Sequence, residues 1–258
     1  MMAVSTSGQG RLAGKVCVIA GARGAIGEGV AKRLESEGAV IVGIDQHEHA
    51  VGVLRLVADL GKEPAVQDVF AQIHRELGKI DVIYNNAGLV DSTDSSALHT
   101  TVETWERIFT ANLTTTWLSC KHGVPYLLRN DPAGGSVINT ASFLAGMGAA
   151  SAQMAYNAAK AAVAQLSRDL GTSLARSGVR VNALALGPIE TPQLRELFAK
   201  VGAEQASRRF LHMPMGRFGS IEELAGTVAY LASDDAGFVT ASLFPINGGI
   251  PGAFTAPV

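Results

Sequence analysis

VCVIAGARGAIG, residues 16–27, passes from an apolar run through three glycines into a helical pattern. It predicts a strand from Lys15 to Ala20 and a helix from about Ile26 to Glu37. The glycines allow a tight turn, and they let a pyrophosphate approach the backbone at the N-terminus of the helix. An ordinary strand-to-helix turn can look the same, so the meaning of this stretch depends on the rest of the chain.

Strand-like apolar runs alternate with helical patterns along the whole sequence. Such alternation indicates an α/β fold, a single-domain, doubly wound parallel sheet covered on both faces, in three α/β/α layers. The other predicted strands are Ala39–Ile44, Val53–Ala58, Ile80–Tyr84, Ser136–Thr140, Val179–Leu186 and Leu243–Ile246. The other predicted helices are Pro64–Leu77, Val102–Leu128 with a capping box of Thr100 and Glu103, one around Tyr156, and Ile221–Leu231 capped by Ser220 and Glu223. Residues 1–12 are expected to be a loose tail and residues 13–258 the domain.

Composition excludes several classes of protein. The chain has 258 residues with 47% hydrophobic residues and a net charge of −2, so neither nucleic acid nor an anionic membrane is an expected partner. No apolar run is long enough to span a bilayer, and the first ten residues lack the apolar core of a signal peptide. The expected compartment is the cytoplasm. Cys17 and Cys120 lie in apolar patterns and are interpreted as small buried hydrophobes.

Asp45 ends the second predicted strand about 20 residues beyond the glycine-rich turn. A carboxylate there can accept hydrogen bonds from ribose hydroxyls and would repel a 2′-phosphate. Arg23, in the turn itself, could instead pair with a phosphate. We weigh Asp45 more heavily, so the pattern favours NAD over NADP as cofactor.

Tyr156 and Lys160 are one helical turn apart and therefore share a face of their helix. A phenol has a pKa of about 10 and is normally inert at neutral pH. An ammonium group nearby is expected to lower that pKa toward the range of a general acid or base. The spacing alone is weak evidence, but it occurs here together with the glycine-rich turn.

In combination, these features resemble the short-chain dehydrogenase/reductase family over nearly the whole chain. The family's marks occur in order. They are the loop from Gly21 to Gly27, Asp59 after the third strand, Asn85-Asn86-Ala87-Gly88 after the fourth, Asn112 in the long helix, Ser142 after the fifth strand, Tyr156 with Lys160, and Gly187-Pro188-Ile189-Glu190-Thr191 after the sixth. The resemblance implies a Rossmann-like fold and reversible hydride transfer between NAD(H) and a secondary alcohol or ketone.

The resemblance also implies roles for single residues. Tyr156 would exchange a proton with the substrate oxygen, Lys160 would assist it and hold the nicotinamide ribose, Ser142 would bond the substrate oxygen, and Asn112 would hold a water. Asp59, with Leu60 beside it, would contact the adenine. The expected cofactor-binding residues are Gly21, Arg23, Ala25, Ile26, Gly27, Asp45, Asp59, Leu60, Asn86, Ala87, Gly88, Tyr156, Lys160, Gly187, Pro188, Ile189 and Thr191.

Two other functions stay open at this point. The resemblance leans toward 3-oxoacyl-carrier-protein reductases and related alcohol dehydrogenases, so one alternative is a 3-oxoacyl-carrier-protein reductase that uses NADPH. The other is a non-catalytic NAD-binding sensor, although such a protein would typically lack the tyrosine or the lysine. Residues 187–216 are expected to form a lid over a small, largely apolar alcohol or ketone.

Two short polar segments are interpreted as surface loops without catalytic groups. His47 and His49 flank Glu48, but no ordered ligand set accompanies them, so a solvated loop is favoured and no metal is expected. Asp91 to Ser96 is interpreted as a polar turn and not as a carboxylate pair.

The Tyr156 helix is rich in alanine around its whole circumference, without a charged outer face in its first three turns. Its outer face is expected to pack on another subunit. Trp105, Phe109, Leu113 and Trp117 of the long helix could join that surface or lie in the core. Together with the family resemblance, this predicts a homotetramer.

Overall fold

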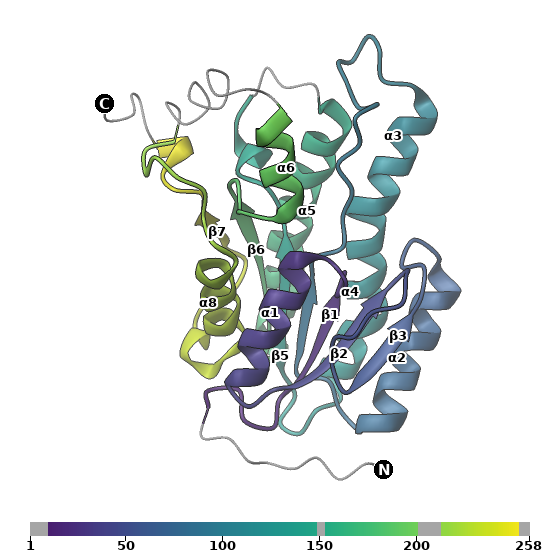
Figure 1. Ribbon diagram of the computed structural model, residues 1–258. Helices are drawn as coiled ribbons and strands as arrows, with labels where there is room; N and C mark the ends of the chain where they lie inside the picture. The colour runs from purple at the N-terminus through teal and green to yellow at the C-terminus, as the bar shows by residue number, and fades with distance from the viewer. Residues whose placement is uncertain (1–9, 149–152, 201–212, 253–258) are drawn as a thin grey trace.

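Seven parallel strands form one sheet in the computed structural model, which describes residues 10–148, 153–200 and 213–252 (Figure 1). The order across the sheet is β3-β2-β1-β4-β5-β6-β7. The strands are β1 (Val16–Ala20), β2 (Val40–Asp45), β3 (Leu54–Val57), β4 (Val82–Asn85), β5 (Gly135–Thr140), β6 (Val179–Leu186) and β7 (Leu243–Ile246). The prediction of a parallel sheet is confirmed.

Helices cover both faces of the sheet, which confirms the predicted three-layer architecture (Figure 1). On one face lie α1 (Ala25–Ser36) and α8 (Ile221–Ala232); on the other lie α2 (Glu63–Leu77), α4 (Thr115–Leu127) and α5 (Met154–Leu174). The capping box of Ser220 and Glu223 at the start of α8 is present as predicted. Within the described residues, no helix has both the length and the apolar character needed to cross a membrane.

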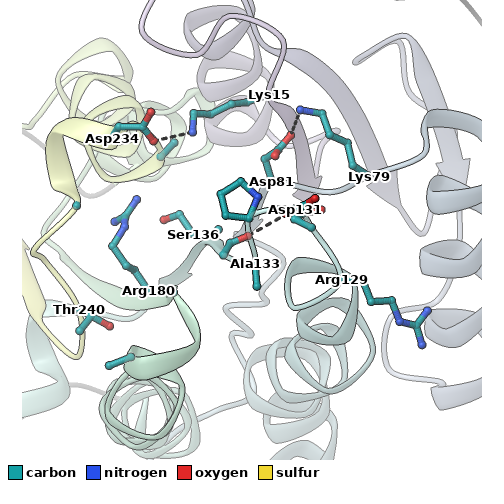
Figure 2. A pocket seen from close by; sticks show the side chains of 18 of the residues that line it. Lys15, Lys79, Asp81, Arg129, Asp131, Ala133, Ser136, Arg180, Asp234 and Thr240 are labelled. Atoms are coloured by element: carbon teal, nitrogen blue, oxygen red, sulfur yellow. Dashed lines mark hydrogen bonds and ion pairs between the residues drawn. The ribbon is translucent and has the colours of Figure 1, made fainter.

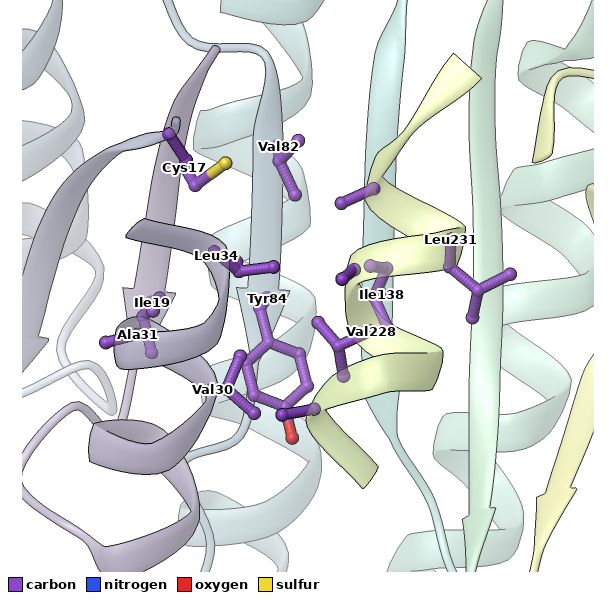
Figure 3. Packing of buried hydrophobic residues seen from close by; sticks show 14 of the residues in the cluster. Cys17, Ile19, Val30, Ala31, Leu34, Val82, Tyr84, Ile138, Val228 and Leu231 are labelled. Carbon is purple, nitrogen blue, oxygen red and sulfur yellow. The ribbon is translucent and has the colours of Figure 1, made fainter. Parts of the chain in front are cut away.

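Alternating side chains of each strand build the two layers of the core. Cys17 and Ile19 of β1 face α1 and α8, whereas Val18 between them faces α2 and α4. Figure 3 shows the first layer, in which Val30 of α1 and Val228 of α8 approach the strands. Burial of each large apolar side chain contributes roughly 1.5–3 kcal/mol to the stability of the fold. The apolar strand segments predicted from the sequence therefore supply the contacts that hold the helices against the sheet.

The predicted long helix is interrupted, which corrects its continuous assignment from Val102 to Leu128. The chain forms α3 (Val102–Phe109), a π-helical turn (Thr110–Thr114) and then α4. Asn112 lies in that turn, and its side-chain amide donates to the carbonyls of Leu89 and Ile108. A π-helical turn widens the helix by one residue and often marks a functional site.

Two further boundaries differ from the sequence prediction. Thr101, not Thr100, caps α3, because its hydroxyl accepts the backbone N–H of Thr104 at 3.2 Å. Leu12 is fully buried and Arg11 forms an ion pair with Glu37, so residues 10–12 belong to the folded domain and not to a loose tail. Residues 1–9 of the predicted tail lie outside the described part of the chain.

The strand order reverses direction beside β1. The chain runs outward through β1, β2 and β3, and it then returns to place β4 on the other side of β1. In open α/β sheets, the crevice outside the carboxyl ends of the strands at such a reversal is where ligands bind. Above this edge lies α6 (Pro192–Lys200), a helix within the predicted lid, while residues 201–212 fall outside the described residues (Figure 1).

Candidate active site

Two adjoining hollows at the carboxyl edge of the sheet collect nearly all of the predicted site residues. The first, about 590 Å³, is lined by Gly21, Asp45, Asp59, Leu60, Asn86, Ala87 and Gly88. The second, about 450 Å³, is lined by Ala25, Ile26, Asn86, Gly88, Asn112, Ser142, Tyr156, Lys160, Gly187, Pro188, Ile189 and Thr191. Both include Gly24, Asn86, Gly88 and Leu89, so they form the two halves of one cleft.

The glycine-rich turn packs directly on the segment after β4. Gly21 has a φ of +82°, and a methyl group on it would lie 2.7 Å from the backbone nitrogen of Ala87. A side chain on Gly27 would collide with the carbonyl oxygen of Gly21. Only glycine permits this approach, which leaves the backbone of the turn open to the cleft at the start of α1.

Asp45 is fixed by backbone donors in the first half of the cleft. Its carboxylate accepts the N–H of Arg23 and the N–H of His47, each at 3.1 Å. Asp59 is held in a similar way, because its Oδ1 accepts the N–H of Gly61 at 2.9 Å. Two carboxylates are therefore held at the edge of this half, where hydroxyl and amino donors of a ligand could meet them.

Arg23 and Gly27 do not line either half of the cleft. The exposed side chain of Arg23 instead borders a separate hollow, together with Glu28, Lys32 and Glu48. Arg23 therefore contributes its backbone N–H to Asp45, and its side chain borders a hollow outside the cleft. Gly27 acts through packing at the start of α1.

Lys160 is buried in the second half, and its ammonium group donates to the carbonyl oxygen of Thr140 at 2.8 Å. The same nitrogen lies 5.7 Å from the centre of the Tyr156 ring. Burial lowers the pKa of Lys160 to about 8 and raises the pKa of Tyr156 to about 12. The predicted lowering of the Tyr156 pKa is wrong for this structure, because burial of the phenol raises that pKa.

Ser142 and Asn112 complete the second half. The hydroxyl oxygen of buried Ser142 accepts the N–H of Leu144 at 3.2 Å, which leaves its proton available for donation. The side chain of Asn112 accepts the N–H of Leu89 at 3.3 Å in addition to its two donated bonds. It therefore holds the segment after β4 against the π-helical turn, and the predicted binding of a water by Asn112 stays a prediction.

Sequence reasoning missed several residues that line the second half. They are Leu89, Val90 and Gln153, and the backbone carbonyl of Thr140 also contributes, whereas Gln193 and Leu194 come from the predicted lid and Phe143 and Leu144 from the loop after Ser142. Each lies within a few positions of a predicted residue, but no periodic pattern separates them from their neighbours. The side chains make this half mainly apolar, with amide groups from Gln153 and Gln193.

A further hollow of about 810 Å³ lies at the opposite, amino edge of the sheet (Figure 2). Its two lysines are paired, since Lys15 lies 2.8 Å from a carboxylate oxygen of Asp234 and Lys79 lies 3.0 Å from one of Asp81. None of the predicted site residues lines it. The cleft predicted from the sequence therefore lies at the carboxyl edge of the sheet and not at this hollow.

His49, in the predicted loop after β2, forms hydrogen bonds with the backbone. A ring nitrogen of His49 accepts the N–H of Val51 at 3.3 Å, and the other lies 3.4 Å from the carbonyl oxygen of Leu56. Across the ranges that the structure describes, no group of three or more His, Cys, Asp or Glu side chains is arranged to hold a metal ion.

Known proteins are similar to this chain over nearly its whole length and not only at the cleft. A family model described as enoyl-(acyl carrier protein) reductase matches residues 20–251. Cis-4-hydroxycyclohexanecarboxylate dehydrogenase of Sinomonas cyclohexanicum is 34% identical over 91% of this chain and 96% of that protein. The 3-oxoacyl-[acyl-carrier-protein] reductase of Thermotoga maritima is 31% identical over 93% of this chain and 99% of that protein. The ligand-free structure of Thermoplasma acidophilum aldohexose dehydrogenase superposes with a TM-score of 0.85 at 28% identity, over 95% of this chain and 96% of that one.

Proposed function

The chain belongs to the short-chain dehydrogenase/reductase family of enzymes that act on CH–OH groups, and within it we propose an NAD(H)-dependent enzyme that interconverts a secondary alcohol and a ketone. One observation carries the proposal. The half of the cleft bordered by the glycine-rich turn and Asp45 adjoins the half that contains Ser142, Tyr156 and Lys160. A dinucleotide lying across both halves would bring its reactive end to the tyrosine.

The residues of the first half fit such a dinucleotide. The close backbone approach at Gly21 and Ala87 leaves room for a pyrophosphate at the N-terminus of α1. Asp45 would accept hydrogen bonds from the adenosine ribose, and Asp59 with Leu60 would border the adenine. When bound, the nicotinamide group supplies the hydride acceptor or donor.

The chain's own residues would bind the substrate oxygen and move its proton. Ser142 has a free hydroxyl proton to donate to that oxygen. Because the pKa of Tyr156 is about 12, its phenol stays protonated at neutral pH and can donate a proton during ketone reduction. The ammonium of Lys160, 5.7 Å from the Tyr156 ring, would stabilise the phenolate that remains and assist the reverse reaction. Asn112 would keep the adjoining backbone in place.

Cofactor preference is proposed from charge. The carboxylate of Asp45 would repel a 2′-phosphate, and the exposed guanidinium of Arg23 borders a different hollow. Both features favour NAD(H) over NADP(H). The relative that is a 3-oxoacyl-carrier-protein reductase keeps a second candidate open, a reductase for that class of substrate that uses NADPH.

The proposed substrate is small and largely apolar. Val90, Phe143, Leu144 and Leu194 line the second half of the cleft, and among the described residues Lys160 is the one charged residue that lines it. A lid formed by residues 187–216 remains part of the proposal, and the structure describes residues 187–200, which include α6, and residues 213–216 of it.

A homotetramer is proposed from the exposed surface. Trp105 and Trp117 keep 39% and 44% of their surface exposed, so the aromatic side chains at these positions are not core residues. Trp105 stacks on Phe109 with ring centres 4.6 Å apart, and Ala158 and Ala162 are only half-buried on α5. Such a surface is suited to a second copy of the chain. Light scattering at micromolar concentration tests this, and an active monomer would contradict it.

Tyr156→Phe is the direct test of the proposed chemistry. The ring remains and the proton donor is lost, so NADH should still bind while turnover of a ketone panel falls by on the order of a hundredfold or more. NADH and NADPH should be compared side by side in the unmodified protein. Turnover near the original rate in the variant would remove Tyr156 from the mechanism, and bound NADH without turnover of any substrate in the unmodified protein would favour a sensor.

A further inference from the structure

In the described part of the chain, no side chain just before α5 caps its first turn, which carries Tyr156. The residue at its N-cap position, Gln153, makes no capping hydrogen bond with its side chain. A helix begins with four backbone N–H groups that have no partner inside the helix, so an uncapped first turn frays readily. A general acid placed there would lose its alignment with the substrate.

Residues from the segment after β4 supply the missing partners. The carboxylate of Asp94 accepts the N–H of Ala155 at 3.0 Å through one oxygen and the N–H of Tyr156 at 2.9 Å through the other. The carbonyl oxygen of Ser95 accepts the N–H of Met154 at 3.2 Å. Three successive N–H groups of α5 are therefore satisfied by two residues that lie about sixty positions earlier in the chain. The segment from Asp91 to Ser96 contains a polar turn, as predicted, and in addition caps α5, which the sequence did not reveal.

Asp94 is itself firmly placed. Only 1% of its surface is exposed, although it carries a carboxylate, and its Oδ1 accepts the hydroxyl of Thr100 at 3.3 Å. That hydroxyl also accepts the N–H of Ser95 at 2.9 Å, which explains why Thr100 does not cap α3 as predicted. A buried carboxylate is stable only with such donors, and a negative charge at a helix N-terminus is favourable.

We propose that Asp94 is a positioning residue for Tyr156: its bidentate hydrogen bonds to the first turn of α5 hold the phenol in line with the substrate oxygen. The inference rests on the proposed catalytic role of Tyr156, and it adds a residue outside the cleft to the reaction. Asp94 lines neither half of the cleft, so its effect on cofactor binding is expected to be small.

Asp94→Asn is the test variant because an amide keeps the shape but offers only one acceptor oxygen. Asp81→Asn is the matched control, since the Asp81 carboxylate also accepts a backbone N–H, that of Val16 at 2.7 Å, but lies at the amino edge of the sheet (Figure 2). In Asp94→Asn, kcat should fall by about tenfold to a hundredfold, as expected for misplacement of a reacting group, with the Kd for NADH within about twofold. In Asp81→Asn, kcat should be unchanged.

A double-mutant cycle separates positioning from general loss of structure. Asp94→Asn should lower kcat little further in a Tyr156→Phe background, because the group it positions is already gone. Equal losses in both backgrounds, or an unchanged kcat in Asp94→Asn alone, would overturn the inference. If Asp94→Asn does not fold, Asp94→Ser serves instead, since a serine hydroxyl can still cap one N–H.

Hydrogen exchange gives a readout that does not depend on turnover. The amides of Ala155 and Tyr156 should exchange on the order of tenfold faster in Asp94→Asn and at their original rate in Asp81→Asn. If the unmodified protein converts no alcohol or ketone, the proposed function fails whatever Asp94 does. If the unmodified protein is active but these amides exchange equally fast in all variants, the proposed role of Asp94 is refuted and the proposed function is not.

Discussion

Gly88→Ala should damage the cleft through a single methyl group. That methyl would lie 2.7 Å from the Oδ1 of Asn112 and 3.4 Å from the Nζ of Lys160. The first distance is well inside the about 3.5 Å at which nonbonded heavy atoms attract, so one of the two groups must move. Asn112 is fully buried and makes three hydrogen bonds to backbone atoms of Leu89 and Ile108, so it cannot yield without losing them.

The expected cost follows from these contacts. Overpacking of this kind costs about 1–3 kcal/mol, and loss of one Asn112 hydrogen bond adds about 1 kcal/mol. The free energy of unfolding of Gly88→Ala should therefore fall by about 2–4 kcal/mol in urea titrations. Because the displaced backbone lines both halves of the cleft, turnover should also fall by on the order of tenfold or more.

Gly226→Ala is the matched control, because its methyl in α8 would lie 3.6 Å from the nearest atom, on Arg33. This ordinary contact in a helix interior should stabilise the protein by roughly 0.5–1 kcal/mol. If Gly88→Ala unfolds at the same urea concentration as the unmodified protein, with an unchanged slope and unchanged turnover, the geometry around Asn112 is refuted.

The remaining predictions concern Lys160 and Asp45. The pKa of Lys160 is about 8 in the folded protein against 10.5 for a free lysine, so between these values the unfolded chain binds the additional proton and the contribution of Lys160 to stability rises with pH. The buried thiols of Cys17 and Cys120, whose pKa values are raised, contribute an opposing fall above pH 9 in the unmodified protein and the variant alike. Below pH 8 the full penalty of Lys160 applies, about 3 kcal/mol, so Lys160→Met should be inactive, and its advantage in the free energy of unfolding over the unmodified protein should shrink between pH 7 and pH 10 in urea titrations; parallel pH profiles for both proteins would contradict this. Asp45→Ala should weaken NAD(H) binding and improve use of NADP(H), as fluorescence titration and steady-state rates with both cofactors would reveal; an unmodified protein that uses NADPH as efficiently as NADH would reject the role of Asp45.

Local patterns were sufficient for the architecture. Central strands of a parallel sheet are buried on both faces, so β6 appears in the sequence as a largely apolar run whose bounds, Val179–Leu186, match the structure. The edge strand β7 is only partly buried, yet its apolar run, Leu243–Ile246, also matches. The turn of residues 21–27 could also be predicted, because its glycines are required by the backbone conformation of a few neighbouring residues. The fold and the position of the cleft therefore followed from contacts within short segments and from the general rule for open α/β sheets.

The properties of the proposed catalytic groups were decided by tertiary structure. Tyr156 and Lys160 are neighbours in sequence, yet their pKa values move in the directions set by burial, which depends on every segment packed around them. Asp94 reaches the first turn of α5 from about sixty residues away, and nothing in the local sequence distinguishes it from Asp91, which pairs with Arg107 at the surface. Desolvation and long-range hydrogen bonds are sums over parts of the chain that meet only after folding, so the sequence could propose the catalytic residues but could not predict their burial or their hydrogen-bond partners.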